Sequence, residues 1–314
     1  MAFIEIKNLS KVFKKPIRGE GLKGMIKTLF SRKYEKIEAV KDISFSINEG
    51  EIVGYIGANG AGKSTTIKMM CGILHPSDGS VTIDGKNFEK QRRQINREIG
   101  VVFGQKTQLW WDIPLIERFN YLCDLLDLKP FLKQNVRQLS LGQRMRADFA
   151  AALIHSPKLV YLDEPTIGLD VLVKDKIRKA IKELNKKDNT TVILTTHDMK
   201  DIEELCNRII IIDKGSILYD GSIHDIKYQF GNTKTVYLPL NANINEEDIK
   251  EKYKNIEITT NDENIILKFS LNEVNLDDVL LLLINKYHIK DFRIDDISIE
   301  DITKKLYEKN DKKD

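Results

Sequence analysis

The feature that most constrains the fold of this chain is a glycine-rich stretch between an apolar segment and a helical one. The apolar run IVGYI at residues 52–56 predicts a strand, and the run IKMMCGIL at residues 67–74 is typical of a helix. Directly after the strand come Gly57, Ala58, Asn59, Gly60, Ala61, Gly62, Lys63, Ser64 and Thr65. Glycines let the backbone N–H groups wrap a phosphate without side-chain clashes, and the start of a helix adds partial positive charge. The pattern therefore predicts a phosphate-binding loop.

Three side chains of this loop have the chemistry to hold a phosphate chain and its metal ion. Lys63 is expected to neutralise the β- and γ-phosphate oxygens, and Ser64 is expected to ligate Mg²⁺. The Thr65 hydroxyl and backbone are expected to hold the α-phosphate side. A plain glycine turn is the alternative, and the match of the whole string argues against it.

From residue 52 to residue 230, short β-rich runs alternate with helical stretches. The runs are IVGYI, VVF, LVYLD, TVILTT and RIIIID. This alternation is the signature of an α/β fold with a mostly parallel sheet. Residues 3–9 and 43–47 are expected to form strands that precede this core sheet.

Two of the predicted strands end in residues suited to catalysis. Asp163 and Glu164 follow LVYL, and His197 follows TVILTT, so all three are expected at the carboxyl edge of the sheet, where ligands of open α/β folds bind. Asp163 is expected to hold Mg²⁺, and Glu164 to orient and deprotonate an attacking water. His197 is expected to hydrogen-bond the γ-phosphate. Solvated strand ends are the alternative, which the upstream phosphate-binding loop disfavours.

The string LSLGQRMR opens the predicted helix MRADFAAALIH and offers a hydroxyl, a glycine and free N–H groups, which suit an anion. In order with the phosphate-binding loop, the Asp163–Glu164 pair and His197, it resembles the signature motif of ABC ATPases. The resemblance implies ATP hydrolysis in a head-to-tail dimer, in which this motif caps the γ-phosphate bound by the second subunit. It carries this role over to Ser140, Gly142 and Gln143. Leu141 departs from the commoner glycine but keeps the backbone N–H.

Three further positions resemble parts of the same family pattern. Within IGLD, Asp170 resembles the D-loop aspartate that couples the two ATP sites. Gln105 resembles the Q-loop glutamine, which contacts Mg²⁺ and the attacking water and touches the membrane partner, although VVFGQ has one extra residue. Phe13 stands in the place of the aromatic that stacks on adenine. Tyr34 is a rival for that role, and a core aromatic is the alternative reading of Phe13.

The resemblance predicts an ABC ATPase domain, a type of P-loop NTPase, over residues 1–230, with N-terminal antiparallel strands and a helical signature subdomain at residues 106–150. That subdomain is shortened, because only residues 106–139 separate Gln105 from Ser140. Residues 14–36 read as a basic insertion, and GLKGMIKTLFSRKYEK within it is expected to form a short amphipathic helix. Packing of this helix on its own domain is the first reading, and contact with anionic headgroups or a partner is the second.

Beyond the breaker at Gly231 and Asn232, the order of predicted elements changes. Residues 233–309 read as strand, helix, two strands around Asn261–Asp262, helix, strand and helix. This order predicts a small α+β accessory domain with helices on one face of a sheet. A dimerisation or regulatory role is open for it.

Composition limits the functions available to the chain. A net charge of +3 is too small to indicate nucleic-acid binding, and three cysteines without a CxxC pair suggest neither a disulfide framework nor a zinc site. The longest apolar run, Val279 to Ile284, is far below the ~20 residues that span a bilayer, and the first residues lack a signal peptide. A cytoplasmic protein that reaches the membrane through a partner is therefore expected.

The resemblance is closest to the ATPase subunits of exporters whose membrane subunits are separate chains, supported by GQKTQLWWDIP and ISIEDITKKLYEK. It implies a homodimer, or a paired ATPase subunit, that drives export with ATP and Mg²⁺ through integral membrane subunits, peripheral at the inner face of the cell membrane. One alternative is a soluble ABC-type ATPase acting on ribosomes or nucleic acid, although the chain has neither two cassettes nor a long coiled-coil insertion. Another is a regulatory switch without transport, which the presence of Glu164 disfavours.

Overall fold

The computed structural model describes residues 2–16, 34–103, 116–230 and 232–311. The chain forms two compact units, Met1–Asp220 and Gly221–Asp314. The division falls before the expected boundary at Gly231, because helix α8 (Ile223–Phe230) contacts α11 (Ile299–Asp311) of the second unit.

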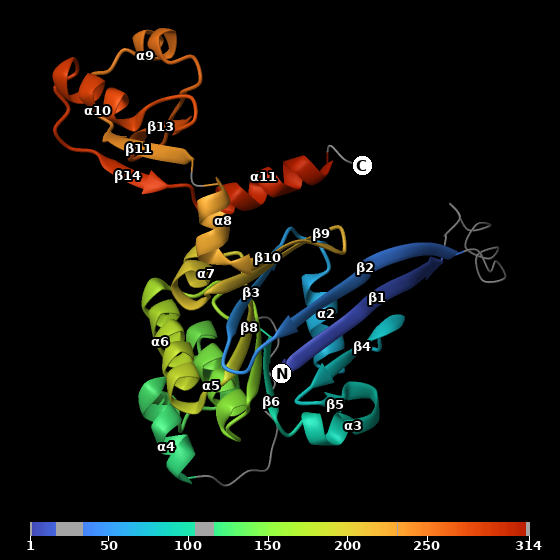
Figure 1. The fold of residues 1–314 in the computed structure, drawn as a ribbon. Helices are drawn as coiled ribbons and strands as arrows, with labels where there is room; N and C mark the ends of the chain where they lie inside the picture. Colours follow the sequence, from blue (N-terminus) through green and yellow to red (C-terminus); the bar gives the residue numbers. More distant parts are fainter. Residues whose placement is uncertain (1, 17–33, 104–115, 231, 312–314) are drawn as a thin grey trace, which may run out of the picture. The chain divides into compact units, whose positions relative to one another are not determined.

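The first unit is built on a six-stranded sheet (Figure 1). Its strands in spatial order are β10 (Ser216–Ser222), β9 (Arg208–Asp213), β3 (Ile52–Gly57), β8 (Thr191–Thr195), β7 (Leu159–Asp163) and β6 (Ile99–Phe103). The pairs β9–β3, β3–β8, β8–β7 and β7–β6 are parallel. Every residue of β8 is buried, as expected for a parallel strand covered on both faces. The predicted mostly parallel core sheet is confirmed.

A second, antiparallel sheet carries the N-terminal strands. Its spatial order is β2 (Tyr34–Ile47), β1 (Ile4–Pro16), β4 (Asp78–Ile83) and β5 (Lys86–Asn87). The β1–β2 ladder continues to the pair Pro16–Tyr34, so both strands are longer than predicted. The predicted helix in the basic insertion is therefore wrong at residues 34–36, where the chain pairs with β1. Residues 17–33 lie outside the described part.

Helices complete the first unit around a core between its two sheets. They are α2 (Lys63–Met70), α3 (Phe88–Ile95), α4 (Ile116–Leu125), α5 (Leu141–Leu153), α6 (Val171–Asp188) and α7 (Met199–Leu205), with 3₁₀ turns at Lys129–Phe131 and Val136–Gln138. The main core joins residues of both sheets to Ile67 and Met70 of α2, which are fully buried. Helix α2 is thus held in place by packing, and its first residue, Lys63, is fixed with it.

Helix α5 is anchored to the segment before it by one buried cation. Arg146 donates from Nη1 to the carbonyl oxygens of Leu126 and Asp127, both at 3.0 Å, and its guanidinium lies 5.0 Å from the centre of the Phe131 ring. This contact fixes the helix that carries the signature string.

The second unit is a four-stranded antiparallel sheet with helices. Its elements are α8, β11 (Thr233–Pro239), α9 (Glu246–Lys252), β12 (Glu257–Thr260), β13 (Asn264–Ser270), α10 (Leu276–Asn285), β14 (Arg293–Asp296) and α11. The chain order from β11 to β14 is β-α-β-β-α-β and the strand order is β12-β13-β11-β14, which is the ferredoxin-like arrangement. The predicted element order is thus found in the structure, with the strands around Asn261 forming a hairpin.

The helices of this unit occupy both faces of its sheet. Ile249 of α9 and Val279 of α10 pack in one core with Leu267 of β13. On the opposite face, Lys268 pairs with Asp301 of α11 at 3.0 Å. The expectation of helices on one face therefore holds for α9 and α10 and is wrong for α11. None of the described helices is long and apolar enough to cross a membrane.

Candidate active site

The glycine-rich loop joins β3 to α2, as predicted, and its glycines are required by close contacts. A Cβ atom on Gly57 would lie 2.6 Å from the carbonyl oxygen of Ile212, and one on Gly62 would lie 2.5 Å from that of Ala39. Gly62 also has a φ of 109°, a conformation that L side chains rarely adopt. The loop can therefore pass between neighbouring segments only with glycine at these places.

Lys63, the first residue of α2, lies folded over the loop. Its Nζ donates to the carbonyl oxygens of Gly57 at 2.6 Å and Ala58 at 3.2 Å, and the residue is only 7% exposed. Burial lowers the pKa of Lys63, and the nearby carboxylates of Glu164 and Asp163 act in the opposite direction. A cation held this way has backbone oxygens and two carboxylates as neighbours, and an anionic ligand at the loop would add a further partner.

A pocket of about 410 Å³ opens at the carboxyl edge of the six-stranded sheet. Its lining comes from β2, the glycine-rich loop, α2 and the loops after β7 and β8, and consists of Ala39, Ala58, Asn59, Gly60, Gly62, Lys63, Ser64, Thr65, Glu164, Ile167 and His197. The volume lies within the usual range for small-molecule sites. We call these residues the pocket side.

The ends of β7 and β8 hold the two carboxylates in fixed positions. The Thr195 hydroxyl donates to Asp163 Oδ1 at 2.6 Å, and the backbone N–H of Glu164 donates to the carbonyl oxygen of Thr195 at 2.9 Å. Glu164 has a φ of 56°, which is uncommon for a residue with a side chain and turns the chain sharply after the strand. The strand end therefore aims one carboxylate into the pocket and keeps the other beside it.

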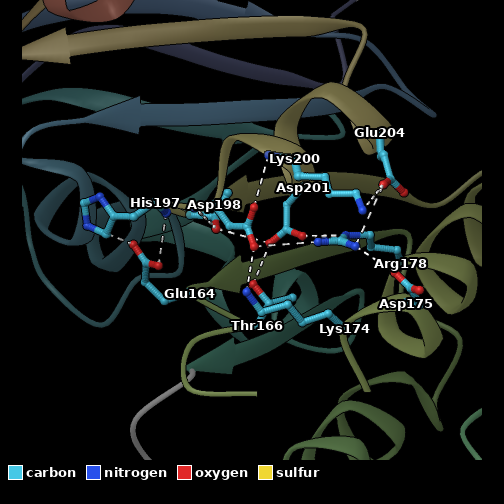
Figure 2. Close-up of polar contacts among 11 residues, drawn as sticks. Glu164, Thr166, Lys174, Asp175, Arg178, His197, Asp198, Lys200, Asp201 and Glu204 are labelled. Carbon is cyan, nitrogen blue, oxygen red and sulfur yellow. Dashed lines mark hydrogen bonds and ion pairs between the residues drawn. The ribbon is translucent and has the colours of Figure 1, made fainter. Parts of the chain in front are cut away.

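Glu164 and His197 contact each other across the pocket wall (Figure 2). Glu164 Oε1 lies 3.3 Å from His197 Nε2, and Oε2 accepts from the His197 backbone N–H, also at 3.3 Å. Burial raises the pKa of Glu164, while His197 and Lys63 oppose the rise. A half-buried carboxylate with a raised pKa has the chemistry of a general base.

The structure brings most of the predicted ligand-binding residues together. Seven of the nine loop residues line the pocket with Glu164 and His197, and the other two, Gly57 and Ala61, lie in the same loop. Asp163 ends β7 next to Glu164. Phe13 and Tyr34 are not among the described lining residues, and both are exposed in the β1–β2 ladder. Gln105 lies outside the described residues.

The signature string occupies a different place in the unit. Ser140 caps α5: its Oγ accepts from the Gln143 backbone N–H at 3.2 Å, and its own N–H donates to Gln143 Oε1 at 2.9 Å. Asp170 caps α6 by accepting from the Val173 N–H at 3.0 Å. Gly142 leaves room for Val173, whose Cγ2 would lie 3.3 Å from an added Cβ. We call Ser140, Gly142, Gln143 and Asp170 the signature side, and none of them lines the pocket.

Apolar side chains are exposed around the signature side. Leu141 is 50% exposed, Val171 67% and Leu172 75%. Leu141 also lies beside Gly168, because a Cβ added there would be 3.2 Å from its Cδ2. The surface around the polar caps of α5 and α6 is therefore apolar and open to solvent in the single chain.

Sequence reasoning missed the polar residues that support the site. Thr195 holds Asp163, and a buried pair formed by Arg178 and Asp201 lies behind the loops that carry Glu164 and His197. No local pattern marks these residues, because their partners are distant in sequence.

The sequence of this chain is similar to one protein family and to several curated proteins. A family model described as ABC transporter matches residues 40–167. The ABC transporter ATP-binding protein NatA of Bacillus subtilis (strain 168) is 33% identical over 63% of this chain and 87% of its own length. The linearmycin resistance ATP-binding protein LnrL of the same organism is 33% identical over 68% of this chain and 73% of its own length. Methionine import ATP-binding protein MetN 2 of Enterococcus faecalis (strain ATCC 700802 / V583) is 32% identical over 64% of each chain.

A similar fold occurs in a solved structure, the ATP-binding cassette MJ0796 as a dimer in a post-hydrolysis state bound to ADP and Pi. The TM-score is 0.59 and the identity 27%, and the match covers 70% of this chain and 98% of that one.

Proposed function

Because this chain belongs to the ATP-binding proteins of ABC transporters, and is thus an ABC-type ATPase, we propose that its pocket side binds ATP with Mg²⁺ and that a second copy completes each site. The observation that carries this proposal is that Lys63, Ser64, Glu164 and His197 line one pocket together.

The loop residues supply the binding. The backbone N–H groups of residues 58–65 surround the β- and γ-phosphates, and Lys63 turns from the loop carbonyls to the phosphate oxygens. Thr65 holds the α-phosphate side. The donor set fits Mg²⁺, because Ser64 lines the pocket and Asp163 ends β7 directly before the lining residue Glu164, so that a hydroxyl and carboxylates offer oxygen atoms. Mg²⁺ would neutralise charge on the phosphate oxygens, and Gln105 would join its ligands.

Glu164 and His197 supply the chemistry at the γ-phosphate. Glu164 orients the attacking water and accepts its proton, a role that suits a half-buried carboxylate with a raised pKa. His197 hydrogen-bonds a γ-phosphate oxygen from the opposite loop and stays beside Glu164 through the 3.3 Å contact. Loss of the γ-phosphate would change the His197 contacts first.

The second copy supplies the signature side to the pocket, because the signature residues of a chain do not line its own pocket. Ser140, Gly142 and Gln143 start helix α5 with N–H groups and a hydroxyl, which suit the γ-phosphate of the facing subunit. Asp170 couples the two sites from the start of α6. The exposed Leu141, Val171 and Leu172 would then be covered by the partner, and the dimeric state of the MJ0796 cassette supports this arrangement. Phe13 remains the proposed platform for adenine.

We further propose that the dimer is peripheral at the cytoplasmic face of the cell membrane and drives export through separate membrane subunits. The similarity to a protein named for linearmycin resistance supports export, because removal of a toxic compound is one way to resist it, while a relative named for methionine import shows that similar ATP-binding proteins also serve import. We also propose that the basic insertion at residues 14–36 contacts anionic headgroups or the membrane partner.

The test is purification of the tagged chain from membranes, followed by assay of ATP hydrolysis and of the proteins that accompany it. Recovery of a multi-spanning partner that stimulates hydrolysis supports the transport role. ATP-dependent uptake of a substrate into inside-out vesicles that contain this complex supports export, because the cytoplasmic face of such vesicles is outside. Sedimentation with ribosomes, with none of the protein on washed membranes, would contradict the transport role.

A further inference from the structure

A buried ion pair lies behind the two loops that carry Glu164 and His197. Arg178 of α6 and Asp201 of α7 are 3% and 0% exposed, and Arg178 Nε donates to Asp201 Oδ1 at 2.6 Å. Charges are rarely buried unless they are paired, because their desolvation is costly. The pair therefore fixes α6 against α7 in one geometry.

The second oxygen of Asp201 serves a different purpose, since it joins the two catalytic loops. Asp201 Oδ2 accepts from the Thr166 hydroxyl at 2.5 Å and from the Thr196 hydroxyl at 3.2 Å (Figure 2). Thr166 follows Glu164 by two residues, and Thr196 directly precedes His197. One carboxylate oxygen thus sets the spacing between the loop after β7 and the loop after β8.

A second acid strengthens the hold on the His197 loop. The Asp198 N–H donates to Thr196 Oγ1 at 3.0 Å, and Asp198 Oδ2 accepts from Lys174 Nζ at 2.6 Å. The same oxygen lies 3.7 Å from Nη2 of Arg178. The loop is therefore fixed to α6 at two points, and α6 begins at the proposed dimer contact, Asp170.

We propose that Asp201, held by Arg178, is a positioning residue. It keeps Glu164 and His197 at the distance and orientation that ATP hydrolysis needs, and it links both residues to helix α6. The inference rests on the proposed roles of Glu164 and His197. The 3.3 Å contacts between these two residues join loops from different strands, so they persist only while the loops keep their spacing. The positive φ of Glu164 also needs surrounding contacts to hold it.

The test uses the threonines, because removing Asp201 or Arg178 would leave an unpaired buried charge and unfold the protein. Thr166→Val removes one hydroxyl and keeps the shape of the buried side chain. We expect kcat for ATP to fall on the order of tenfold with KM unchanged, because misplaced catalytic groups slow chemistry more than binding. Thr166→Ser restores the hydroxyl and is expected to restore kcat.

The matched control is Thr190→Val. Thr190 is also 2% exposed, and its hydroxyl donates to the carbonyl oxygen of Pro157 at 3.4 Å, away from both loops. It is expected to lower the melting temperature as Thr166→Val does and to leave kcat unchanged. An equal loss of kcat in both variants, or none in Thr166→Val, would overturn the inference.

Thr196→Val gives a second, independent variant should Thr166→Val fail to fold. If both threonines act through one Asp201 oxygen, the double variant loses less kcat than the product of the single losses. Fully multiplicative losses would count against a shared oxygen. A wild-type protein that hydrolyses no ATP would instead refute the proposed function, whereas an active wild type with an active Thr166→Val refutes only the positioning role.

Discussion

The pocket side and the signature side belong to one compact unit but are built differently. On the pocket side, residues from four segments of the chain converge on one cavity, and Lys63 and Glu164 are partly or fully buried and influence each other's pKa. On the signature side, Ser140 and Asp170 cap two helices and accept hydrogen bonds from the backbone of those helices, while the apolar residues beside them are exposed. The difference indicates that the pocket side is assembled by contacts within the chain, whereas the signature side presents its helix starts and apolar residues to the surface.

The largest expected effect concerns the pocket side. Glu164→Gln keeps the shape of the side chain but cannot accept the proton of water, so turnover should fall by about 10²–10⁴-fold. ATP binding should remain, and an ATP-bound dimer should accumulate on gel filtration. Glu183→Gln, an exposed change on α6, is the control. Undiminished hydrolysis in Glu164→Gln would remove Glu164 from the role of base.

On the signature side, the informative change is Ser140→Asp. Aspartate caps a helix as well as serine does, so α5 and the stability of the chain should be unchanged. The added charge would face the partner's γ-phosphate, and turnover should fall about a hundredfold. Binding of a fluorescent ATP analogue by the single chain should persist. Full turnover would contradict a phosphate contact at Ser140.

A smaller effect is expected from pH. Because burial raises the pKa of Glu164, its carboxylate should gain a proton at a higher pH than an exposed glutamate would. The base works only when ionised, so the acid limb of kcat/KM should lie above the ordinary glutamate pKa of about 4.3. An acid limb at or below that value would show that Glu164 is not perturbed in the working enzyme.

The smallest expected effect is on stability, and it measures how much the helix cap at Asp170 contributes to the free energy of unfolding. Asp170→Ala removes the acceptor for the Val173 N–H and should lower the free energy of unfolding by about 1 kcal/mol. Asp170→Asn keeps an acceptor and should be near wild type. Urea denaturation of the nucleotide-free chain measures both, and equal stability of the two variants would show that the cap contributes nothing.

Much of the pocket side was predictable because its chemistry is local in sequence. The string from Gly57 to Thr65 carries its own strand and helix, and the residues that end β7 and β8 follow clear apolar runs. The roles of Asp201 and Thr195 were not predictable, because Asp201 contacts Arg178 of α6 and Thr166 after β7, and Thr195 contacts Asp163 of β7, and only the folded chain brings these residues together. The full length of the β1–β2 ladder was also missed, because the expected helix was extended through residues 34–36, where cross-strand pairing with β1 decides the conformation.

The order of elements in the second unit was also readable, since its strands and helices are short and punctuated by turns. The position of α11 was not, because it depends on contacts such as Lys268 with Asp301. Amphipathic patterns give the buried face of a helix but not which face of a sheet it covers.

The most direct test of the account mixes two inactive chains, Lys63→Ala, which lacks the pocket side, and Ser140→Asp, which lacks the signature side. If each site joins the pocket side of one chain to the signature side of its partner, mixed dimers contain one intact site and one doubly defective site. Random pairing of equal amounts then restores about a quarter of the wild-type sites, and ATP hydrolysis should rise well above that of either variant alone. Hydrolysis that stays at the level of the separate variants would contradict the division of the site between two chains.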